Sequence, residues 1–266
     1  MKLRTRVHER LAKGEPAFGA GLFLRNPEAA EFIAKDSPLD WFCVDAQHSQ
    51  AGALGAVDLL RAVQAINPEL TPFVRTPGQE KAWIEQLLDI GYVGLIVPLV
   101  ESKEQAEELV RFACYPPLGK RSYGGLVRAT LYGNYLESFN DHLILLPQVE
   151  SRLGLEHCEA IVNVPGISGV LFGPGDLSLD MGWPLSEQWK SKRFIEAVEH
   201  IVDCCRRAGK IPATLLGKGD SAPAAVKLGI TCLTMASDAW HMHHTMNAQV
   251  HQDLARLRAM PVPAAV

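Results

Sequence analysis

Chargeable side chains follow four short apolar stretches of the chain, each at the point where the stretch ends. Asp45 and His48 follow the run WFCV, and Arg75 ends the run LTPFVR. Glu150 follows LILLPQV, and Asp176 follows SGVLFGPG. Packing alone does not explain this repetition, because a plain loop favours Gly, Ser or Asn. The pattern indicates one catalytic site built from several strand ends.

These residue types suit a definite chemistry. Two carboxylates with no adjacent Cys or His ligand are typical of a hard divalent cation such as Mg²⁺ or Mn²⁺. Arg75 can stabilise a developing oxyanion, and His48, oriented by Asp45, can transfer protons near neutral pH. Backbone N–H groups of the short loop 173–176 can face a substrate carboxylate. Together these groups predict enolate chemistry on a 2-oxo acid.

The elements that must position these groups alternate along the chain. Expected strands are 17–23, 40–45, 70–75, 93–97, 143–149, 168–172, 211–215 and 231–235. Expected helices are 27–36, 54–66, 78–89, 103–112, 154–163, 190–208, 220–228 and 237–258. Strands that alternate with helices pair in parallel. Eight such pairs in 266 residues favour a closed (β/α)8 TIM barrel over an open doubly wound sheet.

No shift in composition marks a domain boundary, so residues 1–266 are expected to form a single barrel domain. The segment 114–142, rich in Gly, Tyr and Arg, is a long loop within it, and 260–266 is a loose tail. Pro147 lies inside an expected central strand, where proline cannot donate a ladder hydrogen bond. A bend or bulge is therefore expected just before Glu150.

Charge and hydropathy exclude several classes of partner. The net charge is −4, with acids and bases mixed, so the chain lacks the basic stripe of a nucleic-acid-binding protein. No apolar run reaches the roughly 18 residues that a membrane span needs. The first residues, MKLRTRVHERLAKGEPAFG, lack the apolar core of a secretory signal. We therefore expect a cytoplasmic enzyme that acts on small molecules.

The motifs on these elements resemble those of the HpcH/HpaI aldolase family, the metal-dependent (class II) pyruvate aldolases. The matching segments follow the family order over nearly the whole chain: DWFCVDAQH (40–48), VRTP (74–77), LLDIG (87–91), YPPLGKRSYGG (115–125), QVES (148–151), PGISGVLFGPGDLS (165–178) and AGK (208–210). The resemblance implies a TIM barrel and reversible retro-aldol cleavage of a 4-hydroxy-2-oxo acid to pyruvate, or a related 2-oxo acid, and an aldehyde through a metal-stabilised enolate. It also implies a homo-oligomer, a hexamer built as a trimer of dimers that exchange their last helix.

The resemblance also implies roles for particular residues. Glu150 and Asp176 match the metal ligands, for Mg²⁺ or Mn²⁺, with Co²⁺ as a further candidate. Asp45 and His48 match the acid–base dyad, and Asp89 matches a polar position counted with the catalytic set, near the site or a subunit boundary. The substrate-binding positions are Phe23, Arg75, Gln148, Gly173, Gly175, Asp176 and Leu215.

Two positions depart from the common family pattern. Gln47 stands where the family commonly has Glu, and Gly175 replaces a frequent Ala or Ser. Gln47 is expected to tune the metal-bound water or the pH optimum, and the departures together bear on which aldehyde is accepted. The candidates are succinic semialdehyde, tartronate semialdehyde, lactaldehyde and simple aldehydes, with pyruvate or hydroxypyruvate as the donor.

Other functions stay open at this point. A Schiff-base aldolase needs a lysine at a strand end, and Lys210 instead precedes its strand. A relative acting on the CoA thioester of a hydroxy acid would need a nucleotide groove, and a non-catalytic barrel could merely bind a 2-oxo acid. A metal site is not expected in the run His241-Met242-His243-His244. On a helix, positions 241 and 244 share a face while 243 points elsewhere.

Overall fold

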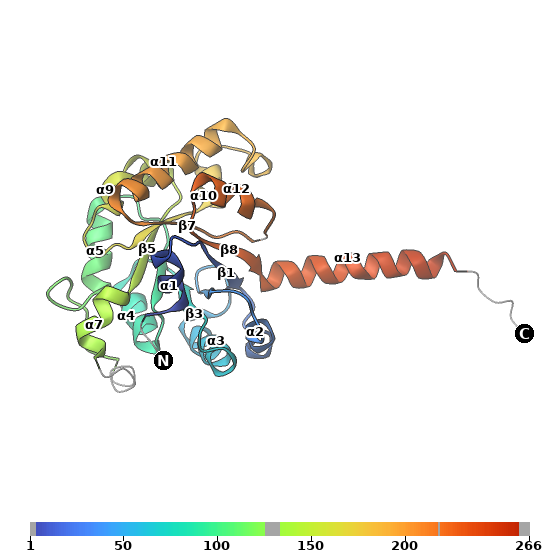
Figure 1. Cartoon of the computed structure of the whole chain (residues 1–266), viewed down its shortest axis with the longest axis horizontal. Coiled ribbons are helices and arrows are strands. Elements are labelled where there is room, and N and C mark those ends of the chain that lie inside the picture. The colour runs from blue at the N-terminus through green and yellow to red at the C-terminus, as the bar shows by residue number, and fades with distance from the viewer. Residues whose placement is uncertain (1–3, 126–133, 218, 261–266) are drawn as a thin grey trace, which may run out of the picture.

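The protein is a closed barrel of eight parallel strands (Figure 1). The computed structural model describes residues 4–125, 134–217 and 219–260. The strands pair in sequence order, and β1 also pairs with β8. They are β1 (Ala17–Leu22), β2 (Trp41–Asp45), β3 (Thr71–Arg75), β4 (Gly94–Val97), β5 (Ile144–Val149), β6 (Gly169–Phe172), β7 (Ile211–Thr214) and β8 (Cys232–Ser237). The expected (β/α)8 TIM barrel is confirmed.

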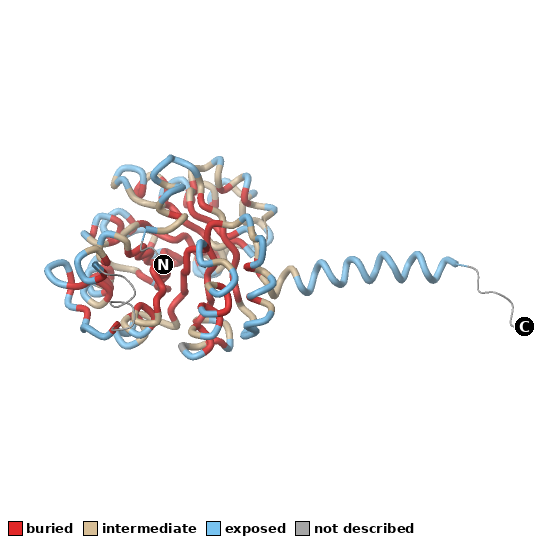
Figure 2. The backbone as a smooth tube through the Cα atoms, turned by 60° about the horizontal axis from the view of Figure 1, so that its bottom comes forward, coloured by how far each residue is buried: buried red, intermediate tan, exposed pale blue. Residues whose placement is uncertain are grey.

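Helices cover the outside of the barrel, as the alternating sequence pattern predicted. They are α2 (Pro27–Ala34), α3 (Gly52–Ile66), α4 (Lys81–Ile90), α5 (Lys103–Ala113), α7 (Tyr135–His142), α8 (Arg152–Glu156), α9 (Cys158–Val162), α10 (Pro174–Asp180), α11 (Lys192–Ala208) and α12 (Ala222–Leu228). Figure 2 shows the buried strands at the centre and exposed backbone around them. Each parallel strand is therefore covered on its outer face, which explains its continuous apolar sequence.

The interior of the barrel is filled by large side chains that lean over glycines. Trp41 and Phe73 pack with ring centroids 4.7 Å apart, and both are fully buried. A Cβ atom on Gly19 would overlap the Trp41 ring, and one on Gly94 would overlap the Phe73 ring. Glycine at these two strand positions therefore lets the aromatic pair occupy the barrel axis.

A short helix that the sequence pattern did not predict closes the N-terminal end of the barrel. Val7, on α1 (Arg6–Ala12), is fully buried in the interior cluster, and its N–H donates to Thr71 Oγ1 (3.2 Å). Arg10 pairs with the buried Asp40 carboxylate (3.0 Å). Because α1 closes the N-terminal end of the barrel, an open site can form only at the C-terminal ends of the strands.

Two local expectations were wrong, and two others lie partly outside the described residues. The expected helix 154–163 is two short helices, α8 and α9, and α10 occupies the expected loop after β6. Within the expected long loop 114–142, residues 135–142 form α7, while 126–133 lie outside the described residues. The expected loose tail 260–266 also lies outside them, apart from Met260.

Of the bend or bulge expected just before Glu150, the bulge is absent at Pro147. The register between β4 and β5 runs one to one from Gly94↔Ile144 to Val97↔Pro147. The missing donor of Pro147 instead faces β6, because the neighbouring odd-numbered residue Leu145 exchanges hydrogen bonds with Ser168 on that side. Pairing between β5 and β6 accordingly starts only at Gln148, so the proline is tolerated without a shift in register.

The last helix, α13 (Asp238–Arg258), leaves the barrel and extends away from it (Figure 1). None of its residues is buried. The carboxylate of Asp238 accepts the N–H groups of Phe23 and Leu24 (2.8 and 2.9 Å), which fixes the start of the helix at the end of β1. Among the described helices, none is long and apolar enough to cross a membrane.

Candidate active site

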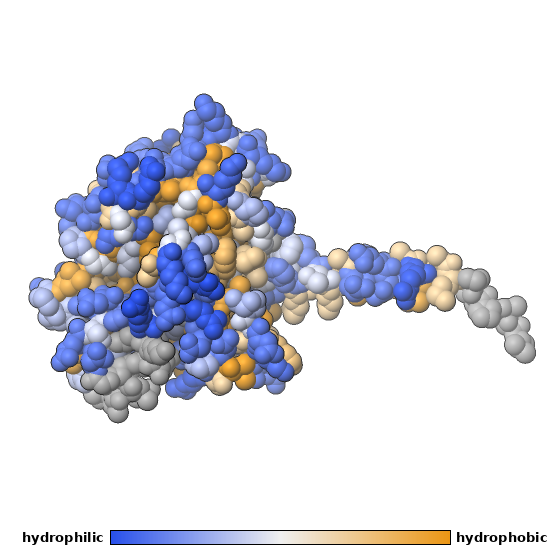
Figure 3. Space-filling view, in the orientation of Figure 1, coloured by the Kyte–Doolittle hydropathy of each residue, from blue (hydrophilic) through white to orange (hydrophobic). Residues whose placement is uncertain are grey.

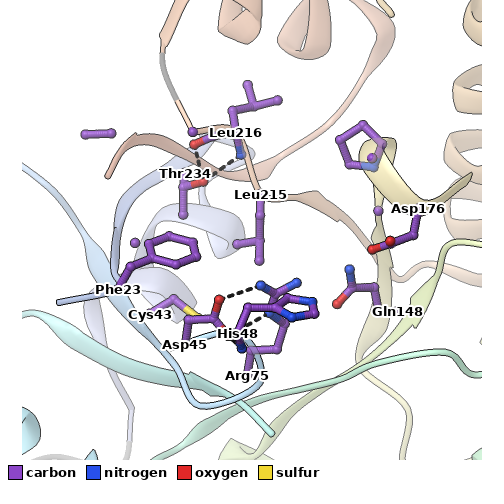
Figure 4. A pocket seen from close by; sticks show the side chains of 16 residues that line it. Phe23, Cys43, Asp45, His48, Arg75, Gln148, Asp176, Leu215, Leu216 and Thr234 are labelled. Atoms are coloured by element: carbon purple, nitrogen blue, oxygen red, sulfur yellow. Dashed lines mark hydrogen bonds and ion pairs between the residues drawn. The ribbon is translucent and has the colours of Figure 1, made fainter. Parts of the chain in front are cut away.

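A cavity of about 420 Å³ opens at the C-terminal ends of the strands (Figure 4). Every strand except β4, or the residues just after it, contributes to its wall. The lining residues are Gly21, Phe23, Cys43, Asp45, His48, Arg75, Gln148, Gly173, Pro174, Gly175, Asp176, Leu215, Leu216, Gly217, Thr234 and Ala236. Positions far apart in the sequence meet here because parallel strands place all their C-terminal ends on one face of the barrel.

Most residues singled out from the sequence meet at this cavity. All seven expected substrate-binding positions line it, as do Asp45 and His48. Glu150 lies just behind the wall, where Gln148 Nε2 donates to its Oε2. Asp89 is not part of the cavity. It lies near the end of α4 on the opposite side of the barrel and pairs there with the buried Arg121 (2.5 Å).

The ends of β2 and β3 are joined by a buried ion pair. Arg75 Nη2 and Nε donate to the two carboxylate oxygens of Asp45 at 2.6 and 3.1 Å (dashed in Figure 4). The bidentate geometry fixes the plane of the guanidinium group. Among the described residues, Arg75 Nη1 has no protein acceptor, so this nitrogen can donate to a ligand oxygen in the cavity.

Asp45 contacts His48 through the backbone of the loop after β2. Besides Arg75, Asp45 Oδ1 accepts the backbone N–H groups of Gln47 (3.0 Å) and His48 (3.2 Å). Through these two backbone contacts Asp45 positions the loop that carries His48. The His48 side chain is exposed and lines the cavity, where it is open to proton transfer.

Glu150 and Asp176 bring two carboxyl groups together beside the cavity. Burial is the main reason that the pKa of Glu150 rises from 4.5 to about 7, and the nearby charge of Asp176 raises it further. The hydrogen bond from the Leu99 N–H to Glu150 Oε1 (2.9 Å) opposes this rise. Two carboxylates held this close repel each other unless a proton or a cation lies between them.

The donor set fits a hard divalent cation. Glu150 and Asp176 supply carboxylate oxygens, and the buried Oε1 of Gln148 has no hydrogen-bond partner among the described residues. Within 4–125, 134–217 and 219–260, no group of three or more His, Cys, Asp or Glu side chains is arranged to hold a metal ion. Two protein carboxylates with further oxygens from substrate and water match the way Mg²⁺ is bound in enzymes.

The start of α10 forms the wall next to the carboxylates. A Cβ atom on Gly173 would overlap Glu150 and Gln148, whereas one on Gly175 would meet open space. The first amides of a helix have no acceptor within the helix, and those of Gly175 and Asp176 lie in this first turn. The junction therefore needs glycine at 173 for close approach, while glycine at 175 widens the cavity.

Two other nucleophile chemistries are not supported at the cavity. Burial raises the pKa of the Cys43 thiol to about 12, and the charge of Asp45 adds to the rise, so this lining cysteine stays protonated at neutral pH. The described residues that line the cavity include no lysine. Lys210 precedes β7 and donates to the carbonyl of Ile167 (2.6 Å) at the other end of the barrel. A Schiff base at Lys210 is thus excluded by its position.

The remaining wall is apolar. Phe23, Leu215 and Leu216 face the cavity with Ala236. The Thr234 hydroxyl is used by the Leu216 backbone, whose N–H and carbonyl it bonds at 2.7 and 2.8 Å. Thr234 and Ala236 were missed from the sequence, although alternate residues of an inward-facing strand could have identified them.

Two features singled out from the sequence lie outside this arrangement. Gln47 does not line the cavity, and its buried Oε1 has no partner among the described residues. The three histidines 241, 243 and 244 lie on the first turns of α13, where His244 stacks on Trp240 with ring centroids 4.1 Å apart. The structure thus gives these histidines a position near the base of α13, apart from the carboxylate pair.

The fold and the site together define a barrel enzyme of the carbon–carbon lyase class, and comparisons with known proteins agree. The profile of the family described as HpcH/HpaI aldolase/citrate lyase matches residues 20–245. A 2-keto-3-deoxy-L-rhamnonate aldolase of Salmonella typhimurium is 39% identical over 211 residues, which cover 76% of this chain and 75% of the relative. The chain belongs to the HpcH/HpaI aldolase/citrate lyase family.

Solved structures support the same assignment. An HpcH/HpaI aldolase from Desulfitobacterium hafniense has a TM-score of 0.82 at 26% identity and covers 95% of this chain and 96% of that one. An HpcH/HpaI aldolase/citrate lyase family protein from Burkholderia cenocepacia has a TM-score of 0.81 at 27% identity, with 92% and 95% covered. The predicted family and the predicted reaction class, a metal-dependent aldolase, are confirmed.

Proposed function

We propose that this chain cleaves a 4-hydroxy-2-oxo acid reversibly to pyruvate, or a related 2-oxo acid, and an aldehyde in the cavity of Figure 4. The observation that carries the proposal is the pair of carboxyl groups, Glu150 and Asp176, next to Arg75 and His48. Few other reactions need an oxygen-rich cation site, a fixed guanidinium group and an exposed imidazole around one small cavity.

Glu150 and Asp176 would hold the cation, Mg²⁺ or Mn²⁺ with Co²⁺ as a further candidate. A divalent cation bound there supplies Lewis-acid polarisation of the 2-oxo group. The first-turn amides Gly175 and Asp176 of α10 would hold the substrate carboxylate. Arg75 Nη1 donates to the 2-oxo oxygen, where negative charge develops during cleavage.

His48 performs the proton transfers. In the cleavage direction it accepts the proton of the 4-hydroxyl group while the bond between C3 and C4 breaks. The electron pair of that bond passes to C3 and the 2-oxo oxygen, which Arg75 stabilises. His48 then returns a proton to C3, which gives pyruvate, and the aldehyde leaves. Asp45 supports both groups, since it clamps Arg75 and the backbone of His48.

The apolar wall favours a small uncharged aldehyde. Phe23, Leu215 and Leu216 surround the space beyond Arg75, and the Thr234 hydroxyl is already bonded to the backbone. Apart from Arg75 and His48, the described lining offers no cationic side chain that could pair with a second carboxylate. A 2-keto-3-deoxy sugar acid of the type that names the Salmonella relatives would release lactaldehyde, which meets this description.

The test is a matrix of aldehydes and metals. The metal-stripped chain is supplied with pyruvate, one aldehyde and either Mg²⁺, Mn²⁺ or Co²⁺, and aldol formation is measured. We expect metal-dependent turnover with lactaldehyde at a kcat/KM at least tenfold above that with succinic semialdehyde. The Glu150→Ala variant is the control and is expected to be inactive.

Turnover that survives removal of the metal, or covalent trapping of pyruvate by borohydride, would contradict the proposed mechanism. A preference for succinic semialdehyde would contradict only the assignment of an uncharged aldehyde. The two parts of the proposal can therefore fail separately.

The proposal includes a homo-oligomer in which α13 is exchanged between subunits. Five apolar side chains recur at spacings of three or four residues on this exposed helix: Met242, Met246, Val250, Leu254 and Leu257. Such spacing places them on one face. Figure 3 shows α13 projecting from the barrel with apolar side chains along part of its length. A helix that is anchored to its own barrel at its start and carries an exposed apolar stripe along the rest of its length suits a second copy of the chain. A hexamer of three such dimers follows the family resemblance.

A further inference from the structure

The loop after β4 carries a left-handed leucine. Leu99 has a φ of +53°, a conformation that non-glycine residues rarely adopt, and its side chain is 49% exposed. Apolar packing of the side chain therefore does not explain the conformation. Backbone strain of this kind persists only where the surroundings impose it, and it concentrates at functional sites.

Three backbone hydrogen bonds impose this conformation. The Leu99 N–H donates to Glu150 Oε1 (2.9 Å), and the Val100 N–H donates to the Gln148 carbonyl (3.1 Å). The Leu99 carbonyl accepts from Gln79 Nε2 at 2.7 Å. The backbone of Leu99 thus contacts the candidate metal ligand through its N–H and Gln79 through its carbonyl.

Gln79 acts as a clamp on this loop from outside the cavity. It lies in the loop between β3 and α4, and its Nε2 also donates to the Pro98 carbonyl at 3.1 Å. The amide nitrogen of Gln79 carries two N–H donors and can bond both carbonyl oxygens, whereas its amide oxygen can only accept. Neither Gln79 nor Leu99 lines the cavity. The clamp can therefore affect a bound cation only indirectly, and the most direct route runs through the Leu99 N–H to Glu150.

Both oxygens of Glu150 are held by donors. Oε1 accepts from Leu99 and Oε2 accepts from Gln148, so the carboxylate cannot rotate without breaking one of these bonds. We propose that Gln79 is a positioning residue, which locks the left-handed Leu99 peptide and thereby orients the Glu150 carboxylate for a divalent cation. This inference rests on the proposed function, because it needs Glu150 to be a metal ligand.

The experiment measures the affinity of the metal-free chain for Mn²⁺, from the electron paramagnetic resonance signal of the free ion. Gln79→Ala removes the clamp, and Gln79→Glu keeps its shape but removes its donor. We expect both variants to weaken Mn²⁺ binding about tenfold, as loss of a supporting hydrogen bond to a metal ligand commonly does. The KM for pyruvate should rise with little change in kcat at saturating metal.

Gln105→Ala is the matched control. Gln105 also bonds the backbone of this loop, since its Oε1 accepts the Glu101 N–H at 2.6 Å, but it does not contact Leu99. We expect its Mn²⁺ affinity to stay within about twofold of wild type. The melting temperature of each metal-free variant is also recorded. If Gln79 had a merely structural role, Gln79→Ala and Gln105→Ala would lower the melting temperature equally, and neither would change the affinity for Mn²⁺.

The outcomes separate the two proposals. If the wild type binds Mn²⁺ in a way that Glu150→Ala abolishes, while Gln79→Ala and Gln79→Glu bind it normally, the positioning role is wrong and the proposed function stands. If Gln79→Glu alone keeps its affinity for Mn²⁺, the hydrogen bonds of Gln79 are not needed, and the proposed clamp is wrong because packing of the side chain is sufficient. If the wild type binds no Mn²⁺, the proposed function is wrong and this inference is overturned with it.

Discussion

At the scale of single residues, the site depends on how Glu150 is charged. The residue is 2% exposed and its carboxyl lies next to Asp176, so ionisation in the absence of a cation is unfavourable. The pKa is raised from 4.5 to about 7. A folded-state pKa above the unfolded value means that the folded chain binds the proton more tightly, so stability is lost as the pH rises through this window.

The corresponding prediction compares the metal-free wild type with Glu150→Gln, which cannot ionise. Between pH 4.5 and pH 7 the melting temperature of the wild type should fall by several degrees relative to the variant, at roughly 2–4 °C per kcal/mol. Thermal scans in the presence of a chelator measure this. Addition of Mn²⁺ at pH 8 should raise the melting temperature of the wild type and not that of Glu150→Gln. Parallel pH curves for the two proteins would show that Glu150 does not titrate in this range.

At the scale of elements, the junction of β6 and α10 decides the shape of the site. Its glycines have different tasks, because Gly173 lies against Glu150 and Gln148 while Gly175 faces open space. Neither has a positive φ, so a substitution acts through the added methyl group and not through backbone strain.

Two alanine variants test this difference. Gly173→Ala should reduce Mn²⁺ affinity and kcat/KM at least tenfold, because the methyl group displaces the Glu150 carboxylate. Gly175→Ala should keep kcat/KM for pyruvate within about twofold while it raises the KM of larger aldehydes. Steady-state kinetics with two aldehydes of different size, together with Mn²⁺ titration, provide the measurement. Equal losses in both variants would mean that the junction tolerates no methyl group anywhere.

The element scale also shows where sequence patterns succeed. The predicted helix 190–208 matches α11, since Phe194, Val198 and Ile201 recur at helical spacing and are buried. The segment 173–176 was expected to be a short loop, and its Gly-Pro-Gly sequence is typical of turns. In the structure Pro174 is the first residue of α10, a position where its missing N–H has no cost.

At the scale of the whole molecule, α13 is the feature that a single subunit leaves unexplained. The helix is 21 residues long, none of them is buried, and its apolar stripe faces solvent. An exposed apolar stripe of this length is a mark of an interaction surface.

The prediction uses two matched pairs of substitutions on α13. Met246→Glu with Val250→Glu places two charges on the apolar stripe, and Ala248→Glu with Gln252→Glu places two on the opposite face. The first pair should reduce the molar mass measured by light scattering from that of an oligomer towards that of the 29.1 kDa chain. The second pair should leave the mass unchanged. An oligomer that survives the first pair would show that the stripe does not hold the subunits together.

The sequence by itself determined the barrel and most of the candidate site. Apolar runs that alternate with amphipathic segments imply parallel strands, and chargeable groups at their ends, from Asp45 to Asp176, meet on one face because every strand points the same way. Only the tertiary structure decided which of these groups bind one another. Asp45 has several donors within reach. Because β2 packs against β3, the carboxylate of Asp45 accepts both of its side-chain hydrogen bonds from Arg75. Leu99 left no signal in the sequence, because its left-handed conformation is imposed by Glu150, Gln148 and Gln79, which approach it only when the barrel is closed.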